Sequence, residues 1–396
     1  MVAQTIHIIG AGIAGLTAAL SFSAKGHQVE IIEQAPALSE VGAGLQISPN
    51  ASRILIALGL GQAIEEASMH PASITLTSGH SLRKIAEVPC GDFAARRWGA
   101  PYGVMHRSDL QTLLLNAVTA DPNCTLRLDR RIEAADLDAI AMPPDGAANG
   151  LIVGADGVWS QTRRRVPNAA TPRFSGQIAW RFKVSAELAG AVVDRSNVTA
   201  FLAPRSHLVA YPLENGKTIN MVAIAAGKDP GQTWAARENP TDRAGLLAAF
   251  GDWNSDIKDI LRQAPEMTWW PLFEMADGGW FDGARTVLIG DAAHAMTPFA
   301  AQGAAMAIED GFELAEAVGA PTALDAAEEL SARLSRYEAH RRTRIGRARN
   351  RAAFNRFAYH ARGPVLLGRN LVLALKPAES LAADLDWLYG YRAAGL

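Results

Sequence analysis

The sequence contains few cysteines and almost no long apolar segment. Only two of its 396 residues are cysteine, Cys90 and Cys124, and they lack the spacing of a metal site. We therefore expect two unpaired thiols in a reducing cytoplasm, and no bound metal. The apolar N-terminal run "IHIIGAGIAGLTAALSF" is rich in glycine and lacks the basic start and the cleavage site of a signal peptide. No other stretch approaches about 18 unbroken apolar residues, which predicts a soluble, cytoplasmic protein without a membrane partner.

The chain also lacks a net charge of either sign. It has 38 Lys and Arg against 40 Asp and Glu, so its overall charge gives no indication of a nucleic-acid partner. Arginines are nevertheless frequent between Arg333 and Arg362. Apolar residues keep helical spacing there, which indicates a helix packed on a core with a solvated arginine face. These apolar residues are Leu330, Leu334, Tyr337, Ile345, Ala348 and Ala352. A non-enzymatic protein that binds partners through this helix remains an alternative.

What the sequence does contain is an alternation of strand and helix patterns. Residues 5–9 and 27–34 are typical of strands that flank a helix at 13–25, which is a β-α-β unit of a parallel sheet. Runs rich in Val, Ile, Tyr and Trp at about 175–225 predict antiparallel strands, and the parallel pattern returns at 284–294. We therefore expect an α/β fold. A Rossmann-like domain is interleaved with an antiparallel-sheet domain and is followed by C-terminal helices.

The first glycine-rich turn, "GAGIAG", lies between the first strand and the first helix. Gly10 allows the tight turn, Gly12 lets the backbone approach a pyrophosphate, and Gly15 lets helix and strand pack closely. We expect Ala14, inside the same turn, to contact the nucleotide as well. Free N–H groups at the start of the helix favour phosphate. Glu33 ends the second strand, where an acid accepts hydrogen bonds from ribose and repels a 2′-phosphate, so FAD or NAD is favoured over NADP.

Two further turns decide between FAD and NAD. The motifs "LIVGADG" (151–157) and "TVLIGDAAH" (286–294) each end a strand at glycine and aspartate. A dehydrogenase needs only the first turn, whereas the ribityl chain of a flavin needs an acceptor at another strand end, and Asp291 suits that role. Beyond it, the helix that begins at Gly303 and Ala304 would direct its N–H groups at the negative charge of reduced flavin. We therefore predict tightly bound FAD.

These motifs, in this order, resemble the single-component FAD-dependent aromatic hydroxylases, especially the salicylate hydroxylase-like branch. The resemblance covers nearly the whole chain and includes "EVGAGLQISPNA" (40–51), "MHRSDLQTLL" (105–114), "GQIAWR" (176–181) and "DWLYGY" (386–391). It implies that Arg107 lies near the ribityl-pyrophosphate of FAD. It also implies that Asp156 serves both flavin binding and reaction with NADH or NADPH, a transient co-substrate. Gln34 and Gln46 match positions that line the cofactor.

We expect three parts in this chain. The FAD-binding domain comprises residues 1–73, 98–174 and 275–320, the substrate domain comprises 74–97 and 175–274, and the C-terminal helical region comprises 321–396.

Candidate catalytic residues lie in "RSHLVAYPL", where His207, Val209 and Tyr211 share one face of a strand. A phenolate is more reactive than a phenol, whose pKa is roughly 10, so the reaction needs a base. We expect His207 to be that base and Tyr211 to orient the substrate or relay its proton. A His/Tyr pair at this strand position is linked to that step in relatives that act on hydroxybenzoates. The structural alternative is that Tyr211 only packs against its neighbours and that His207 is a polar residue at the rim. We expect Gln302 to face the flavin edge and the substrate, and His294 to support its turn by hydrogen bonding.

The sequence therefore predicts an FAD-dependent monooxygenase that hydroxylates a phenolic or hydroxybenzoate-type ring with NAD(P)H and O2, through a flavin C4a-hydroperoxide. If the attacked carbon bears a carboxylate, CO2 would leave, as in salicylate hydroxylation. A flavoprotein of the same fold that reduces or dehydrogenates without inserting oxygen is the nearer alternative. We expect a monomer or a homodimer.

Overall fold

The structure is a computed structural model, and it describes residues 5–38, 44–141, 150–190, 192–229, 231, 236–237, 240–324 and 327–396. Residues 40–43 of the "EVGAGLQISPNA" motif lie outside the described residues. Among the helices in the described ranges, none is both long and apolar enough to cross a membrane.

Five parallel strands form the first sheet. Their order is β15 (Thr286–Leu288), β8 (Leu151–Gly154), β1 (Thr5–Ile9), β2 (Gln28–Ile32) and β7 (Cys124–Arg127). Helix α1 (Ile13–Ser23) joins β1 to β2, so the predicted β-α-β unit is present, and the helix ends at Ser23 rather than at Lys25. The sheet is buried on both faces, since Ile6, Ile8 and Ile31 on one face are 0% exposed and Ile9 and Ile32 on the other are 5% and 3% exposed.

Eight strands form the second sheet, which is antiparallel except for one pair. Its order is β13 (Ala236–Arg237), β14 (Met267–Met275), β9 (Pro172–Ser185), β12 (Thr218–Ala226), β11 (Ser206–Leu213), β10 (Val198–Ala203), β4 (Ser73–Ser78) and β5 (Lys84–Pro89). The turn between β11 and β12 contains Asn215 and Gly216 at positive φ, as their residue types favour. Strands β4 and β10 pair in parallel, which no local turn signal reports because the two strands are distant in sequence.

The remaining elements connect and cover these sheets. Strands β3 (Gly44–Ile47) and β6 (Gly103–His106) pair with each other. The helices are α2 (Pro49–Leu55), α3 (Gly61–Ala67), α4 (Gly91–Trp98), α5 (Arg107–Ala120), α6 (Ala134–Ala141), α7 (Ala186–Ala189), α8 (Pro240–Ala249), α9 (Ser255–Gln263), α10 (Asp291–His294), α11 (Gly303–Val318), α12 (Ala327–Tyr359), α13 (Gly363–Leu375), α14 (Ala378–Ala383) and α15 (Asp386–Tyr389). Short turns of other helix types are η1 (Ile56–Leu60), η2 (Thr162–Arg165), η3 (Glu214–Gly216), η4 (Pro298–Ala300) and η5 (Pro321–Leu324). The predicted α/β fold with C-terminal helices is confirmed.

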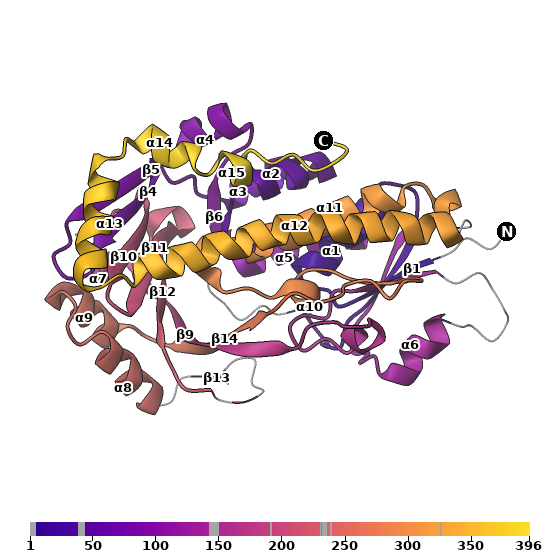
Figure 1. The fold of residues 1–396 in the computed structure, drawn as a ribbon, viewed down its shortest axis with the longest axis horizontal. Helices are drawn as coiled ribbons and strands as arrows, with labels where there is room; N and C mark the ends of the chain where they lie inside the picture. The colour runs from indigo at the N-terminus through magenta and orange to yellow at the C-terminus, as the bar shows by residue number, and fades with distance from the viewer. Residues whose placement is uncertain are drawn as a thin grey trace.

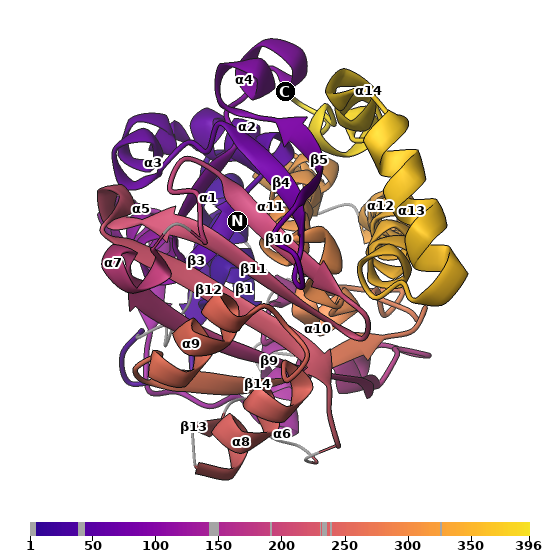
Figure 2. The same ribbon diagram turned by 90° about the vertical axis from the view of Figure 1, so that its left-hand side faces the viewer.

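The two faces of the second sheet have different partners. On one face, Trp180 and Phe182 of β9 pack with Phe250 and Ile257 in a core beneath α8 and α9 (Figure 2). On the other face, Ile224 of β12 packs with residues of η4 and α12. Helix α12 runs along most of the molecule and reaches both sheets (Figure 1). The second sheet therefore has one face turned toward the first domain, and this face carries the candidate catalytic residues.

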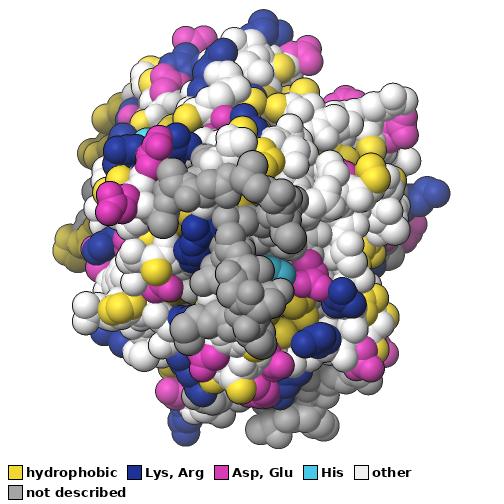
Figure 3. All heavy atoms as spheres, turned by 90° about the vertical axis from the view of Figure 1, so that its right-hand side faces the viewer, with side chains coloured by type: hydrophobic (Ala, Val, Ile, Leu, Met, Phe, Trp, Pro, Cys, Tyr) yellow, Lys and Arg dark blue, Asp and Glu magenta, His cyan; other side chains and the backbone are white. Residues whose placement is uncertain are grey.

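One face of the molecular surface mixes charges of both signs (Figure 3). On the face in Figure 3, Lys and Arg side chains are interspersed with Asp and Glu side chains over the described residues. This distribution agrees with the near-zero net charge of the sequence. The described residues on the face in Figure 3 form no single-sign stripe of the kind that marks a nucleic-acid interface.

Candidate active site

The three turns singled out in the sequence lie at one edge of the first sheet. They follow β1, β8 and β15, which are neighbours in a parallel sheet, so their carboxyl ends point the same way. Backbone hydrogen bonds join neighbouring turns. Ala155 N–H after β8 donates to Ile9 O at the end of β1 (2.8 Å), and Ile289 N–H after β15 donates to Gly154 O at the end of β8 (2.9 Å). The glycine-rich start and the distant "GDAAH" stretch therefore face a common region.

The glycines of the first turn have three different geometries. Gly10 has a φ of +104°, and a Cβ on it would lie 2.5 Å from Ala155 O, so only glycine fits. A Cβ on Gly15 would lie 1.9 Å from Gly10 O, which shows how closely helix and strand pack. A Cβ on Gly12 would meet nothing within 4 Å. The open space beside Gly12 is where a pyrophosphate would approach the backbone.

The turn after β15 packs directly on the start of α1. A Cβ on Gly290 would lie 2.9 Å from the Ala14 Cβ. Arg163 of η2 clamps the turns after β8 and β15, because Nε donates to Ala292 O (2.9 Å) and Nη1 donates to Val158 O (2.9 Å). No motif in the sequence pointed to Arg163. Its only signal was its place in a run of three arginines, at 163–165, shortly after the GADG turn.

The predicted acids occupy the edges of this region. Glu33 accepts from the N–H groups of Ala11 (2.8 Å) and Ala35 (2.9 Å), so it already braces the first turn. Asp156 accepts through Oδ2 from Gln161 N–H and from the Thr162 backbone and hydroxyl, while its Oδ1 is buried without a partner. Asp291 is exposed at the first position of α10.

The predicted cofactor fits these residues. A buried acceptor without a partner at Asp156, an exposed carboxylate at Asp291 and open space at Gly12 match a ligand that carries both hydroxyl donors and phosphates. The starts of α1 and α11 fit as well, because neither has a side-chain cap or an acid in its first turn. Their N–H groups are therefore available to an anion.

Gln302, Gly303 and Ala304 lie at the start of α11. Gln302 is buried, and its Nε2 donates to Ser48 Oγ (3.1 Å) while its Oε1 accepts from Asn50 Nδ2 (3.3 Å). These contacts tie the loop to α2, and contact between Gln302 and substrate stays a prediction. The preceding residue, Ala301, has a φ of +51°, a left-handed conformation that is strained for a residue with a Cβ. Such strain often occurs at functional loops, and this loop reaches the second sheet.

His207 and Tyr211 are both buried on β11, with exposed fractions of 1% and 2%. The His207 ring lies 4.9 Å from the Phe299 ring of η4 and 5.4 Å from the Tyr359 ring of α12. Tyr211 lies beside β3, since a Cβ on Gly44 would be 2.9 Å from the Tyr211 hydroxyl. Burial lowers the pKa of His207 well below its ordinary value and raises the pKa of Tyr211. His207 is therefore neutral at neutral pH, and Tyr211 keeps its proton.

The other predicted cofactor contacts are spread along the same side of the first domain. Gln34 is exposed directly after Glu33. Gln46 of β3 accepts a hydrogen bond from the Tyr102 hydroxyl. Arg107 is partly buried at the first position of α5. Contact of these three residues with FAD stays a prediction.

A buried ion cluster supports the turn after β15, and no sequence motif predicted it. Asp310 of α11 accepts from Gly290 N–H (2.9 Å), from His294 and from Arg341 Nε (2.8 Å). Arg344 of α12 donates to Glu309. The prediction that His294 supports its turn is confirmed. The prediction of a solvated arginine face is wrong for Arg341 and Arg344, which are 0% and 5% exposed because α11 supplies buried acids opposite them.

The described cysteines and acids show no metal site. Cys90 is buried and Cys124 partly buried, both are free thiols, and burial raises the pKa of each to about 12. Within the described ranges, no group of three His, Cys, Asp or Glu side chains is placed to hold a metal ion. The two thiols keep their protons at neutral pH and are therefore poor nucleophiles.

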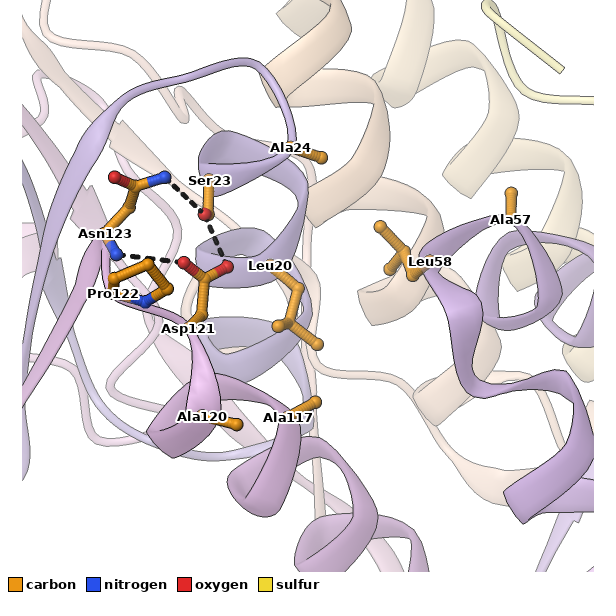
Figure 4. A pocket seen from close by; sticks show the side chains of 10 residues that line it. All are labelled: Leu20, Ser23, Ala24, Ala57, Leu58, Ala117, Ala120, Asp121, Pro122 and Asn123. Carbon is orange, nitrogen blue, oxygen red and sulfur yellow. Dashed lines mark hydrogen bonds between the residues drawn. The ribbon is translucent and has the colours of Figure 1, made fainter.

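One surface groove of about 440 Å³ lies away from this edge (Figure 4). It is lined by the C-terminal ends of α1 and α5 and by η1, where Ser23 and Asn123 bond to each other and to Asp121. Because α1 starts at the cofactor edge, its C-terminal end lies at the opposite edge of the sheet. The groove is therefore separate from the candidate active site.

Comparison with known proteins defines the class. Residues 3–352 match the family described as "FAD binding domain", and the chain belongs to this family. It is 33% identical over 398 residues to a 3-amino-4-hydroxybenzoate 2-monooxygenase of Streptomyces platensis, with 98% of this chain and 96% of the relative covered. It is 32% identical to 3-hydroxybenzoate 6-hydroxylase 1 of Aquipseudomonas alcaligenes, with 98% of each chain covered.

Solved structures share the fold. A salicylate hydroxylase substrate complex superimposes with a TM-score of 0.77 at 22% identity, covering 98% of this chain and 96% of that chain. Klebsiella pneumoniae HpxO complexed with FAD and uric acid gives a TM-score of 0.75 at 21% identity, covering 96% of this chain and 95% of that chain. With the sequence relatives, these findings make the chain an FAD-dependent monooxygenase of the single-component aromatic hydroxylase type.

Proposed function

We propose that this enzyme hydroxylates a phenolic ring that carries a carboxylate, with NAD(P)H and O2 as co-substrates. The names of the two relatives at 32–33% identity specify hydroxylated benzoates as their substrates. The observation that carries the proposal is the position of His207 and Tyr211. Both lie on the β11 face that meets the loop before α11, where the flavin ring is expected.

FAD, when bound, accepts hydride from NAD(P)H and activates O2, and the chain's own residues bind and position the reactants. Gly12 leaves room for the pyrophosphate, in the same turn as Gly10, Ala14 and Gly15. Glu33 would accept from the adenosine ribose and Asp291 from the ribityl chain. The start of α11 would stabilise negative charge on the reduced ring. We assign residues 1–73, 98–174 and 275–320 to this FAD-binding part.

We assign residues 74–97 and 175–274 to the substrate part, which covers the reaction centre and excludes water. His207 and Tyr211 are four residues apart on one strand, so their Cα atoms are separated by roughly 13 Å. They cannot contact each other directly. They would instead contact opposite ends of one aromatic ring, with His207 accepting the phenol proton and Tyr211 donating a hydrogen bond to the other end.

The test is oxidation of NADH and NADPH by purified holoenzyme with 3-hydroxybenzoate, 3-amino-4-hydroxybenzoate and salicylate under 18O2. We expect at least one compound to accelerate the oxidation and to gain one 18O atom. Acceleration without 18O in any product would support the alternative, a reductase or dehydrogenase of the same fold. Release of CO2 in the same assay would show that the attacked carbon carries the carboxylate.

A variant of His207 tests its role as the base. General base catalysis contributes roughly 10²–10⁴-fold, so His207→Phe should lower kcat by at least about 100-fold for a phenol of ordinary pKa. The loss should shrink for a nitro-substituted phenol, which ionises without help. An equal loss for both phenols would show that His207 only fills space.

A further inference from the structure

A second histidine lies behind His207. His360 directly follows α12, and its Nε2 is 2.9 Å from His207 Nδ1, with 5.1 Å between the ring centroids. His360 is partly exposed, whereas His207 is buried. The pair therefore connects the covered face of β11 with the protein surface.

The hydrogen bond between the two rings links their tautomers. It contains one proton, so one ring donates and the other accepts. Since Nδ1 of His207 is engaged by His360, Nε2 is the nitrogen left for a substrate. Nε2 can accept a phenol proton only if Nδ1 carries the ring proton and donates it to His360. His360 must then be neutral, with its own proton on Nδ1.

The surroundings keep both rings neutral. Burial, together with the positive charge of Arg356, lowers the pKa of His360 to about 4. The rings around the pair are Phe299 of η4 and Tyr359 of α12, and neither carries a charge at neutral pH. Burial and His360 lower the pKa of His207. A lone imidazolium at His207 is therefore unfavourable, and a base at this position needs an outlet for its proton.

We propose that His360 positions His207 in the tautomer that accepts a phenol proton and carries that proton to solvent. This inference rests on the proposed function. The phenol O–H bond breaks as His207 Nε2–H forms, and His207 Nδ1–H breaks as His360 Nε2–H forms. His360 Nδ1 then releases its proton to water, and the substrate is left as phenolate. The reverse transfer returns a proton to the product oxygen and restores both tautomers.

The variants His360→Phe and His360→Gln test the relay. Phenylalanine removes the hydrogen bond, while glutamine keeps an acceptor for His207 Nδ1–H but cannot pass a proton on. Arg362→Gln is the matched control, because Arg362 is exposed, follows His360 by two residues, and immediately precedes α13 without capping it through its side chain. The readout is the phenolate absorption of 3-hydroxybenzoate bound to the oxidised holoenzyme, together with proton release to an indicator dye.

We expect wild type and Arg362→Gln to ionise the bound phenol at neutral pH. Both His360 variants should lose roughly 10- to 100-fold in phenolate formation and in kcat, with KM changed less than about threefold. Wild-type ionisation in His360→Phe would overturn the inference, and if that variant does not fold, wild-type proton release in His360→Gln would do so. If wild type ionises none of the phenols and hydroxylates none, the proposed function fails, and this inference fails with it.

Discussion

At the scale of single residues, two glycines of the first turn have different roles. Gly10 is required by the fold, and we propose that Gly12 is required for cofactor binding. Gly10 needs its positive φ and lies against the backbone of Ala155, so its glycine serves the fold. Gly12 has an ordinary φ of −74° and open space on its Cβ side, so the apoprotein accommodates alanine there. The packing of the chain therefore does not require glycine at this position, and we propose that the pyrophosphate does.

We accordingly predict that Gly12→Ala folds with a wild-type melting temperature but loses at least about tenfold in FAD affinity, since a methyl group displaces the pyrophosphate. Gly10→Ala should fail to fold or melt at a much lower temperature. Gly346→Ala is the control, because its Cβ also meets nothing within 4 Å but it lies on α12. Fluorescence titration of apoprotein with FAD measures the difference. Unchanged affinity in Gly12→Ala would contradict the assigned phosphate position.

Asp310 gives a second prediction at this scale. Its burial opposes ionisation, but His294 and Arg341 outweigh burial and lower the pKa from 3.8 to about 2. A lowered pKa in the folded state means that the carboxylate stabilises the protein above pH 3.8, and that this stability is lost as pH falls toward about 2. Asp310→Asn should therefore lower the urea midpoint at neutral pH and flatten its dependence on pH in this window. A steeper dependence would contradict the ion pairing.

At the scale of elements, α12 is joined to α11 through buried charge. Arg341 binds Glu309 (2.7 Å), Asp310 (2.8 Å) and Glu313 (3.3 Å) of α11. Without it, Glu309 would keep Arg344 and Asp310 would keep His294, but the cluster would lose the cation that contacts all three acids. Arg342, the next residue, is 40% exposed, and its ion pairs to Asp277 and Glu338 are long, at 3.7 and 3.9 Å.

We predict that Arg341→Met destabilises the protein by roughly 3–5 kcal/mol, because it removes the cation shared by three buried carboxylates. Arg342→Met, the matched control, should change stability by less than about 1 kcal/mol. Urea denaturation followed by circular dichroism compares the two. Similar midpoints for both variants would show that the buried cluster does not hold α12 in place.

The elements also show what the sequence can predict. Local periodicity and turn residues were sufficient to predict strand β1, helix α1 and the strand face shared by His207 and Tyr211. The burial of Arg341 could not, because an arginine pattern does not reveal acids on another helix. The His207–His360 contact joins residues 153 positions apart, and no local signal reports it.

At the scale of the whole molecule, the chain brings three turns and one loop to a single edge. The alternative of an interaction protein with a free arginine helix is disfavoured, because Arg341 and Arg344 are buried against α11. Turns from distant parts of the sequence instead meet at this edge, where we propose one elongated FAD site. The adenosine end is assigned to Glu33 and the ribityl end to Asp291, so the two acids should act on different parts of the same ligand.

Competition between ADP and FAD on the apoprotein tests this arrangement most directly. ADP contains the adenosine end of FAD but lacks the ribityl chain and the flavin. Loss of a hydrogen bond to a charged group corresponds to roughly 1.5–3 kcal/mol, or about 10- to 100-fold in affinity. We predict that Glu33→Gln weakens both ADP and FAD, whereas Asp291→Asn weakens FAD and leaves ADP within about twofold of wild type. If Asp291→Asn binds FAD as wild type does, or loses ADP to the same degree as FAD, the two turns do not hold opposite ends of one cofactor.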